Sequence, residues 1–76
     1  LRDIRLALEG LATEKAAALA TREDAAALRC IAAELMAVRT RGDTVADRQK
    51  IREFHFTLYA IAAQPTLLRM IESLWL

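Results

Sequence analysis

One helix, together with its start and stop signals, is encoded between Thr21 and Asp43, where the sequence reads TREDAAALRCIAAELMAVRTRGD. Thr21 is a residue type that caps helix N-termini, and the acidic residues that follow it complement the helix dipole in the first turn. Gly42 suits a C-terminal stop, and Asp43 suits the N-cap of the next helix. The sequence therefore predicts a helix over 22–40 and a short connection after it. Its apolar positions share one face: Leu28, Ile31, Leu35 and Val38.

The same helical spacing of apolar residues extends outward on both sides of this helix. It predicts a first helix over 2–19, a third over 44–63 and a fourth that starts near Pro65. The expected inner stripes are Leu1, Ile4, Leu8, Leu11 and Ala12 in the first helix; Ile51, Phe54, Leu58, Ile61 and Ala62 in the third; and Leu67, Leu68, Ile71, Leu74 and Trp75 in the fourth, whose apolar arc reaches Leu76. Short connections between long amphipathic helices make neighbours antiparallel. We expect an all-α fold, an antiparallel helical bundle.

Composition restricts the possible function classes. The chain has 76 residues and a net charge of +1, which is too balanced for a stand-alone nucleic-acid binder. No apolar run approaches the length of a membrane span, and the N-terminal residues do not form a signal peptide. The single cysteine, Cys30, is expected to be a small buried hydrophobe and fits a reducing cytoplasm. The chain starts without Met and ends without a capping signal, so we expect it to be a part of a longer protein.

Few residues in this chain could carry chemistry. There is no nucleophile elbow, no glycine-rich phosphate loop and no pair of closely spaced cysteines, so the sequence does not indicate an enzyme. His55 is the single histidine and lies at the edge of the third apolar stripe, where it could be a packed residue or a functional ligand. Arg5 lies four residues before Glu9, next to the first apolar stripe. Its guanidinium could pair with Glu9 or anchor a carboxylate ligand.

Three stretches in this order resemble the C-terminal effector-sensing (FCD) domain of the FadR subfamily of GntR-type transcription regulators. They are IRLALEGLA from Ile4, ATRED from Ala20 followed by an Ala/Leu-rich helix, and REFHFTL from Arg52 leading through AAQP into Leu67 and Leu68. The resemblance covers essentially the whole chain. It implies a bundle of six or seven helices behind an N-terminal winged helix-turn-helix, in a homodimer that binds small metabolites, often carboxylates. Residues 1–76 would then hold a partial effector-binding and dimerisation domain, without the DNA-binding domain and the final bundle helices.

The resemblance also implies a divalent metal (Zn, Ni or Mn) held by an Asp and a His one helical turn apart, with two more histidines on later helices. Residues at i and i+4 share a helix face, so such a pair can converge on one ion. His55 matches the histidine, but Ile51 stands at the Asp position, and Gln64 replaces the usual Asn before the proline. His55 is therefore either a metal ligand of the full-length protein or a direct contact to the effector.

The leading hypothesis from the sequence is the sensing and dimerisation part of a cytoplasmic transcription regulator. Arg5 is predicted to anchor the effector's carboxylate, and His55 to contribute a polar contact. DNA would be bound only through the N-terminal domain, and no membrane partner is expected. The alternative is a structural helical module that binds another protein and no small molecule. An enzyme built on a helical bundle is a third hypothesis, which no motif in the chain supports.

Overall fold

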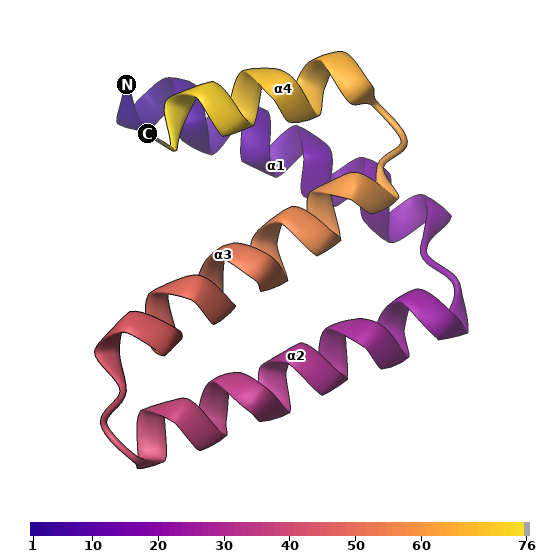
Figure 1. The fold of residues 1–76 in the computed structure, drawn as a ribbon. Helices are drawn as coiled ribbons and strands as arrows, with labels where there is room; N and C mark the ends of the chain where they lie inside the picture. Colours follow the sequence, from indigo (N-terminus) through magenta and orange to yellow (C-terminus); the bar gives the residue numbers. More distant parts are fainter. Residues whose placement is uncertain (76) are drawn as a thin grey trace. The chain divides into compact units, whose positions relative to one another are not determined.

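A computed structural model describes residues 1–75, which form four α-helices and no strand (Figure 1). The helices are α1 (Arg2–Leu19), α2 (Arg22–Thr40), α3 (Thr44–Ile61) and α4 (Pro65–Leu74). The all-α fold expected from the sequence is therefore confirmed. Within the described residues, no helix is both long enough and apolar enough to cross a membrane. Leu76, the expected end of the fourth apolar arc, lies outside the described residues.

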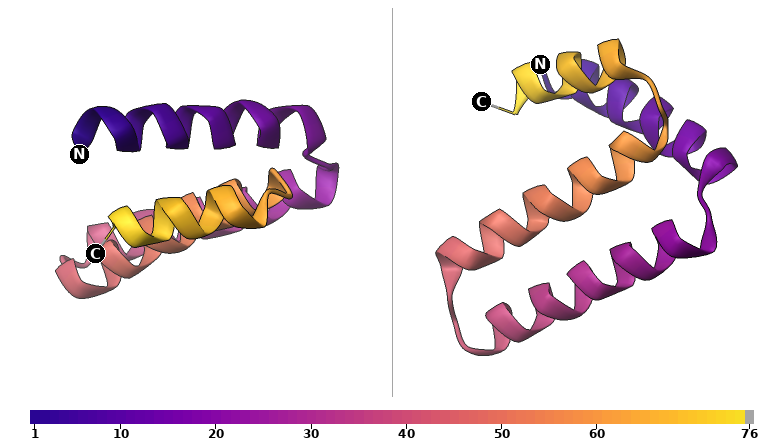
Figure 2. Two further views of the ribbon diagram at one scale, coloured as in Figure 1. Left: turned by 90° about the horizontal axis from the view of Figure 1, so that it is seen from above. Right: turned by 45° about the vertical axis from the view of Figure 1, so that its right-hand side comes forward.

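The helices are distributed over two compact units. One unit combines Leu1–Ala20 with the segment that begins at Leu58, so it holds α1, the last turn of α3, and α4. The other unit spans Thr21–Thr57 and holds α2 and most of α3. Within each unit the helices run in opposite directions, α1 against α4 and α2 against α3 (Figures 1 and 2). The expected antiparallel arrangement is confirmed in both.

The start of α2 is closed by a capping box between Thr21 and Asp24. The Thr21 hydroxyl accepts a hydrogen bond from the Asp24 backbone N–H at 3.1 Å, and the Asp24 carboxylate accepts one from the Thr21 N–H at 2.9 Å. Two backbone donors that the helix geometry leaves without partners are thereby satisfied. The N-cap predicted from the sequence is confirmed.

In the connection from α2 to α3, hydrogen bonds cap both the end of α2 and the start of α3. At the end of α2, the Gly42 N–H donates to the Arg39 carbonyl and the Asp43 N–H donates to the Val38 carbonyl, each at 3.0 Å, which is the Schellman pattern. This pattern needs a left-handed residue, and Gly42 adopts a φ of 73°. Asp43 then caps α3, since its side chain accepts from the Ala46 N–H at 3.0 Å. Both predicted roles, the glycine stop and the aspartate cap, are confirmed.

The two glycines of the chain are expected to respond to alanine with opposite signs. Gly42→Ala forces a β-carbon into the left-handed region and should lower the free energy of unfolding by about 1 kcal/mol. Gly10 lies inside α1, and a β-carbon there meets nothing within 4 Å. Gly10→Ala should therefore raise the free energy of unfolding by about 0.5–1 kcal/mol, because alanine restricts the unfolded chain. Urea unfolding of both variants checks this, and a loss of stability in Gly10→Ala would contradict it.

The third helix ends at Ile61, two residues before the predicted end at 63. Ala62 and Ala63 make tighter turn bonds to the carbonyls of Tyr59 and Ala60, at 3.2 and 3.1 Å. Ala63 then adopts a left-handed φ of 55°, which breaks the helix. Pro65 imposes the early end, because the residue before a proline is pushed out of the helical region. Gln64, with φ of −123° and ψ of 83°, shows this displacement.

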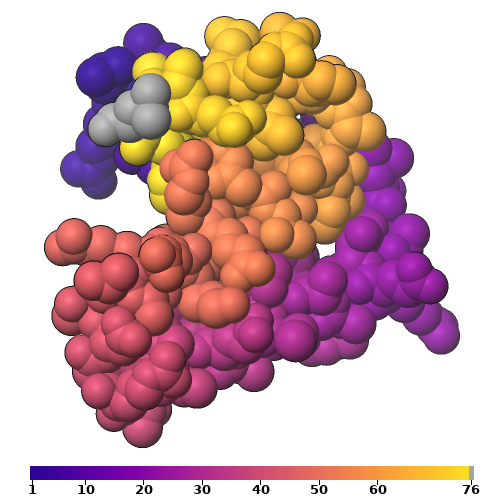
Figure 3. All heavy atoms as spheres, in the orientation of Figure 1, coloured from indigo at the N-terminus to yellow at the C-terminus, as the bar shows by residue number. Residues whose placement is uncertain are grey.

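The inner face of α1 differs from the predicted stripe. Of the predicted positions, Ala12 is fully buried and Leu8 is half-buried, as expected, whereas Ile4 and Leu11 are 54% and 43% exposed and Leu1 is more exposed still. Ala16, outside the predicted stripe, is also fully buried. The buried face is thus turned from the expected one and includes the half-buried side chains of Arg5 and Glu9. Small alanines allow α4, the helix in contact with α1, to approach closely. Figure 3 shows the atoms of α4 lying beside the N-terminal residues of the chain.

The core of the second unit follows the prediction more closely. Ile31 and Val38 are buried on α2, and the other two predicted positions, Leu28 and Leu35, are half-buried. The expectation for Cys30 is wrong, because this cysteine is exposed. Cys30 immediately precedes the buried Ile31, so the helical rotation of about 100° per residue carries it off the inner face.

Candidate functional site

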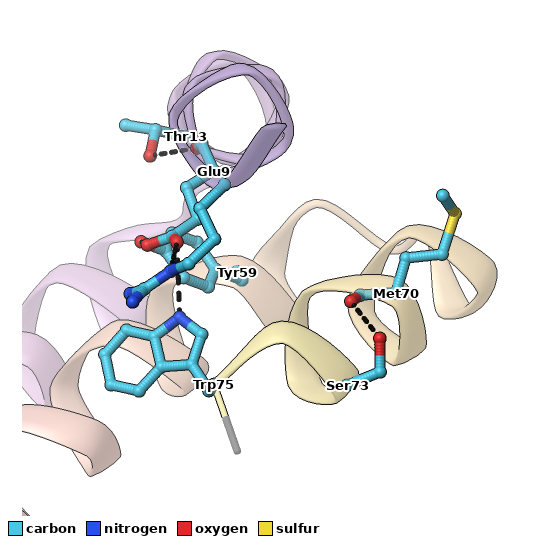
Figure 4. A network of polar contacts seen from close by, with 7 residues as sticks. Glu9, Thr13, Tyr59, Met70, Ser73 and Trp75 are labelled. Atoms are coloured by element: carbon cyan, nitrogen blue, oxygen red, sulfur yellow. Dashed lines mark hydrogen bonds and ion pairs between the residues drawn. The ribbon is translucent and has the colours of Figure 1, made fainter. Parts of the chain in front are cut away.

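The most densely hydrogen-bonded side chain of the first unit is the carboxylate of Glu9 on α1 (Figure 4). It accepts a hydrogen bond from the Tyr59 hydroxyl at 2.6 Å, one from Arg5 Nε at 2.9 Å and one from the Trp75 indole N–H at 3.2 Å. A carboxylate has enough lone pairs for all three donors. We refer to Arg5, Glu9, Tyr59 and Trp75 as the Glu9 cluster.

The members of the Glu9 cluster come from three elements. Arg5 reaches Glu9 because residues four apart share one face of a helix. Tyr59 comes from the last turn of α3, and Trp75 follows the last residue of α4. The cluster therefore holds α1 to residues that lie 50 and 66 positions away in the sequence. It is a tertiary contact made of polar groups, whereas the fully buried residues of this unit are apolar.

The cluster changes the protonation equilibria of its members. Burial alone would raise the pKa of Glu9, but the hydrogen bonds from Tyr59, Arg5 and Trp75 outweigh it, so the pKa lies below the ordinary value. The pKa of Tyr59 is raised, first by its burial and then by its hydrogen bond to the Glu9 carboxylate. Both shifts favour an ionised Glu9 facing a neutral Tyr59 at neutral pH.

Arg5 is oriented by two members of the cluster. Its Nε is held by Glu9, and the centre of its guanidinium lies over the Trp75 ring, 4.7 Å from the centroid. A cation over an indole face is attracted by the negative face of the ring. The Arg5 side chain nevertheless remains 39% exposed, against 15% for Glu9. It is therefore oriented and still accessible to a ligand.

A pocket of about 550 Å³ opens beside this guanidinium. Its walls are formed by Leu1, Arg2, Arg5, Leu6, Glu9 and Leu74. The volume lies within the range of small-molecule sites. Two guanidinium groups and one carboxylate line it together with three leucines, so its chemistry suits an anionic ligand with an apolar part. The prediction of Arg5 as a carboxylate anchor is consistent with this position, and it stays a prediction.

A smaller pocket of about 270 Å³ lies at the connection between α3 and α4. Its lining is mostly apolar and consists of Tyr59, Ala60, Ala63, Gln64, Pro65 and Leu68. No charged side chain lines this pocket, which therefore lacks a group that could anchor a carboxylate.

His55 belongs to the second unit, on α3, and its ring is half-buried. Its Nδ1 lies 2.8 Å from the Ile51 carbonyl oxygen. Its ring lies edge-on to the Phe54 ring, with the two ring centroids 5.8 Å apart. A carbonyl can only accept, so Nδ1 carries the proton and a neutral ring has its lone pair on Nε2. This is the tautomer in which Nε2 can accept a hydrogen bond or bind a metal.

The residues around His55 do not by themselves fit a metal site. Ile51, one turn before His55, offers its backbone carbonyl to the ring and no carboxylate to an ion. Among residues 1–75, no three His, Cys, Asp or Glu side chains gather at metal-binding distance. A metal at His55 would need ligands from beyond the described residues, so no chemical step is assigned to one.

The structure therefore places the two predicted site residues in different units, Arg5 in the first and His55 in the second. It confirms the Arg5–Glu9 pair that their spacing indicated. Tyr59 and Trp75 were not predicted from the sequence as partners of that pair. The available signal was chemical: an aromatic residue with a polar donor needs an acceptor when it is buried, and Glu9 is the acidic residue closest to the inner face of α1.

Comparison with known protein families identifies the family of this chain. The family model of the FCD domain matches residues 1–76. The chain belongs to the FCD domain family. FCD domains are the C-terminal effector-binding domains of GntR-family transcription regulators, which are not enzymes. The all-helical fold agrees with this family. Searches among curated proteins and among solved structures gave no match to the chain.

Proposed function

We propose that this FCD domain senses a small carboxylate metabolite and that Arg5 anchors the carboxylate. The observation that supports this most is the position of Arg5, which lines the pocket of about 550 Å³ with its guanidinium oriented and accessible. A guanidinium presents parallel N–H donors that match the two oxygens of a carboxylate. The leucines of the same pocket favour a ligand with an apolar part.

We further propose that His55, in the second unit, makes a polar contact to an effector. Its Nδ1 lies 2.8 Å from the Ile51 carbonyl oxygen, and this contact orients the ring on α3. The proposal includes the wider setting expected from the sequence: a cytoplasmic regulator of the FadR subfamily, in which residues 1–76 are part of the effector-binding and dimerisation domain. DNA would be bound by a winged helix-turn-helix outside these residues.

In the full-length regulator, Arg5→Ala is expected to weaken the effector response by roughly 10- to 100-fold, the value of a charge-assisted hydrogen bond. His55→Ala should weaken it less, because the ring contributes a single hydrogen bond and Arg5 contributes a charged one. Operator binding without effector should stay close to wild type in both variants. The measurement is release or strengthening of operator binding, by fluorescence anisotropy, as a function of effector concentration.

The matched control is Arg29→Ala, which removes an exposed arginine of α2 with the same loss of charge. It should leave the effector response unchanged. If Arg5→Ala and His55→Ala both respond like wild type, the site assignment is wrong. If Arg29→Ala weakens the response as much as Arg5→Ala, net charge and not the pocket is responsible.

We also propose that the domain associates with a second copy. Large apolar side chains remain exposed on every helix, with Leu6 at 63%, Met36 at 62% and Val45 at 65% exposure. Covering apolar surface of this kind with a second copy removes it from water, which favours association. Light scattering on the full-length protein at high concentration is expected to give the mass of a dimer. A monomer under these conditions would contradict the proposal.

A further inference from the structure

Arg5 already has an anionic partner in the pocket where we place the effector's carboxylate. Glu9 accepts from Arg5 Nε at 2.9 Å, and both residues line the same pocket, together with Arg2. Any carboxylate that approaches Arg5 therefore meets the negative charge of Glu9 as well. An internal carboxylate and an external one would share one guanidinium.

The two members of this ion pair are held to very different degrees. Glu9 is fixed by donors from other elements, Tyr59 at 2.6 Å and Trp75 at 3.2 Å, and its side chain is 15% exposed. Toward residues 1–75, Arg5 makes its hydrogen bond to Glu9 and its contact with the Trp75 ring, and its side chain is 39% exposed. When the pair opens, Glu9 keeps two of its hydrogen bonds, and Arg5 is the group that moves.

We propose that Glu9 is an internal counter-ion that competes with the effector's carboxylate for Arg5 and so sets the concentration at which the domain responds. The proposal rests on the proposed function. Binding exchanges one carboxylate for another on the same guanidinium, and Glu9 keeps its hydrogen bonds from Tyr59 and Trp75. The pair that is opened lies four residues apart on a helix and is partly exposed, so the exchange costs little.

The exchange of carboxylates on Arg5 would also change the contact between α1 and α4. The Trp75 indole contacts both sides of the pair, because its N–H donates to Glu9 and its face carries the Arg5 guanidinium. Trp75 follows the last residue of α4, whereas Arg5 and Glu9 belong to α1. Removal of Arg5 from the ring therefore changes the contact between the end of α4 and the start of α1. The effector's arrival at α1 is transmitted to α4 within the same unit.

The test uses the full-length regulator and three carboxylates as probes, acetate, succinate and citrate, titrated by calorimetry at constant ionic strength. Glu9→Gln removes the charge and keeps the size of the side chain. It is expected to bind the best of the three probes roughly two- to fivefold more tightly than wild type, the range of a partly exposed ion pair. Glu14→Gln, an exposed site on α1, makes the same change in net charge and should leave affinity unchanged.

A second variant separates charge from loosened packing and covers the case in which Glu9→Gln does not fold. Tyr59→Phe removes one donor from Glu9 and leaves its charge, so Glu9 should pair more strongly with Arg5 and the probe should bind up to about twofold more weakly. Tighter or unchanged binding to Tyr59→Phe would overturn the proposal. So would unchanged or weaker binding to a folded Glu9→Gln.

The same experiment distinguishes this inference from the proposed function. If Arg5→Ala abolishes binding of the probe and Glu9→Gln leaves it unchanged, Arg5 is the anchor and the competition by Glu9 is wrong. If none of the three carboxylates binds wild type or Glu9→Gln, the carboxylate assignment fails, and the inference fails with it. Binding to Glu9→Gln alone would support both.

Discussion

Glu9→Ala is expected to lower the free energy of unfolding of the sensing domain by about 2–4 kcal/mol. The substitution removes the acceptor of three hydrogen bonds at once. Tyr59 is only 4% exposed, so its hydroxyl would lose this hydrogen bond where water has little access. Urea unfolding followed by circular dichroism measures the loss. A loss under about 0.5 kcal/mol, as for an ordinary surface site, would show that the cluster adds nothing to stability.

The pH dependence of stability provides an independent check on the same residue. The pKa of Glu9 is lowered in the folded state, so its contribution is present above the ordinary pKa of 4.5 and is lost as pH falls through the folded value. The raised pKa of Tyr59 makes stability depend on pH in the opposite direction. Its contribution is present below the ordinary value of 10.0 and is lost as pH rises through the folded one. Wild type should therefore lose more stability in acid than Glu9→Gln, and more in alkali than Tyr59→Phe.

Ile71→Ala should destabilise the same unit by about 2–5 kcal/mol. Ile71 is the largest fully buried side chain, at 0% exposure, on the helix that contacts α1. Alanine there loses the transfer free energy of the removed groups and leaves a cavity between helices that are already close. Chemical unfolding at constant temperature measures the effect.

Two control substitutions, one at Ile71 and one at the adjacent Met70, give losses of stability for comparison with Ile71→Ala. Ile71→Val removes one methylene group and should cost only about 0.5–1.5 kcal/mol. Met70→Ala shortens an adjacent side chain that is 49% exposed, and surface changes of this kind usually stay within about 0.5 kcal/mol. Equal losses for Ile71→Ala and Met70→Ala would mean that α4 is not packed through Ile71.

The helices could be predicted from the sequence because their ends are encoded locally. Thr21 with Asp24, and Gly42 with Asp43, act through hydrogen bonds to backbone groups at most a few residues away. Such signals need no knowledge of tertiary structure. The end of α3 was missed by two residues because alanines continue a helical pattern. The left-handed turn at Ala63 depends instead on the proline that follows.

The inner face of α1 and the Glu9 cluster could not be predicted in the same way. Counting apolar residues assigns the leucines to the core and the charges to solvent. Glu9 and Arg5 lie on the packed face because Tyr59 and Trp75, far away in the sequence, supply partners for them. Spacing along one helix could indicate the Arg5–Glu9 pair, but only the fold could bring donors from α3 and α4 to it.

The two helix connections at the ends of α3 differ in backbone strain. The one before it has a glycine in the left-handed region and a side-chain cap, so its backbone is relaxed and fully bonded. The one after it places Ala63 in that region at a cost of about 1 kcal/mol or more. The backbone strain of α3's two connections therefore resides at Ala63, beside the pocket lined by Pro65 and Leu68, and not at Gly42, where the left-handed region suits glycine.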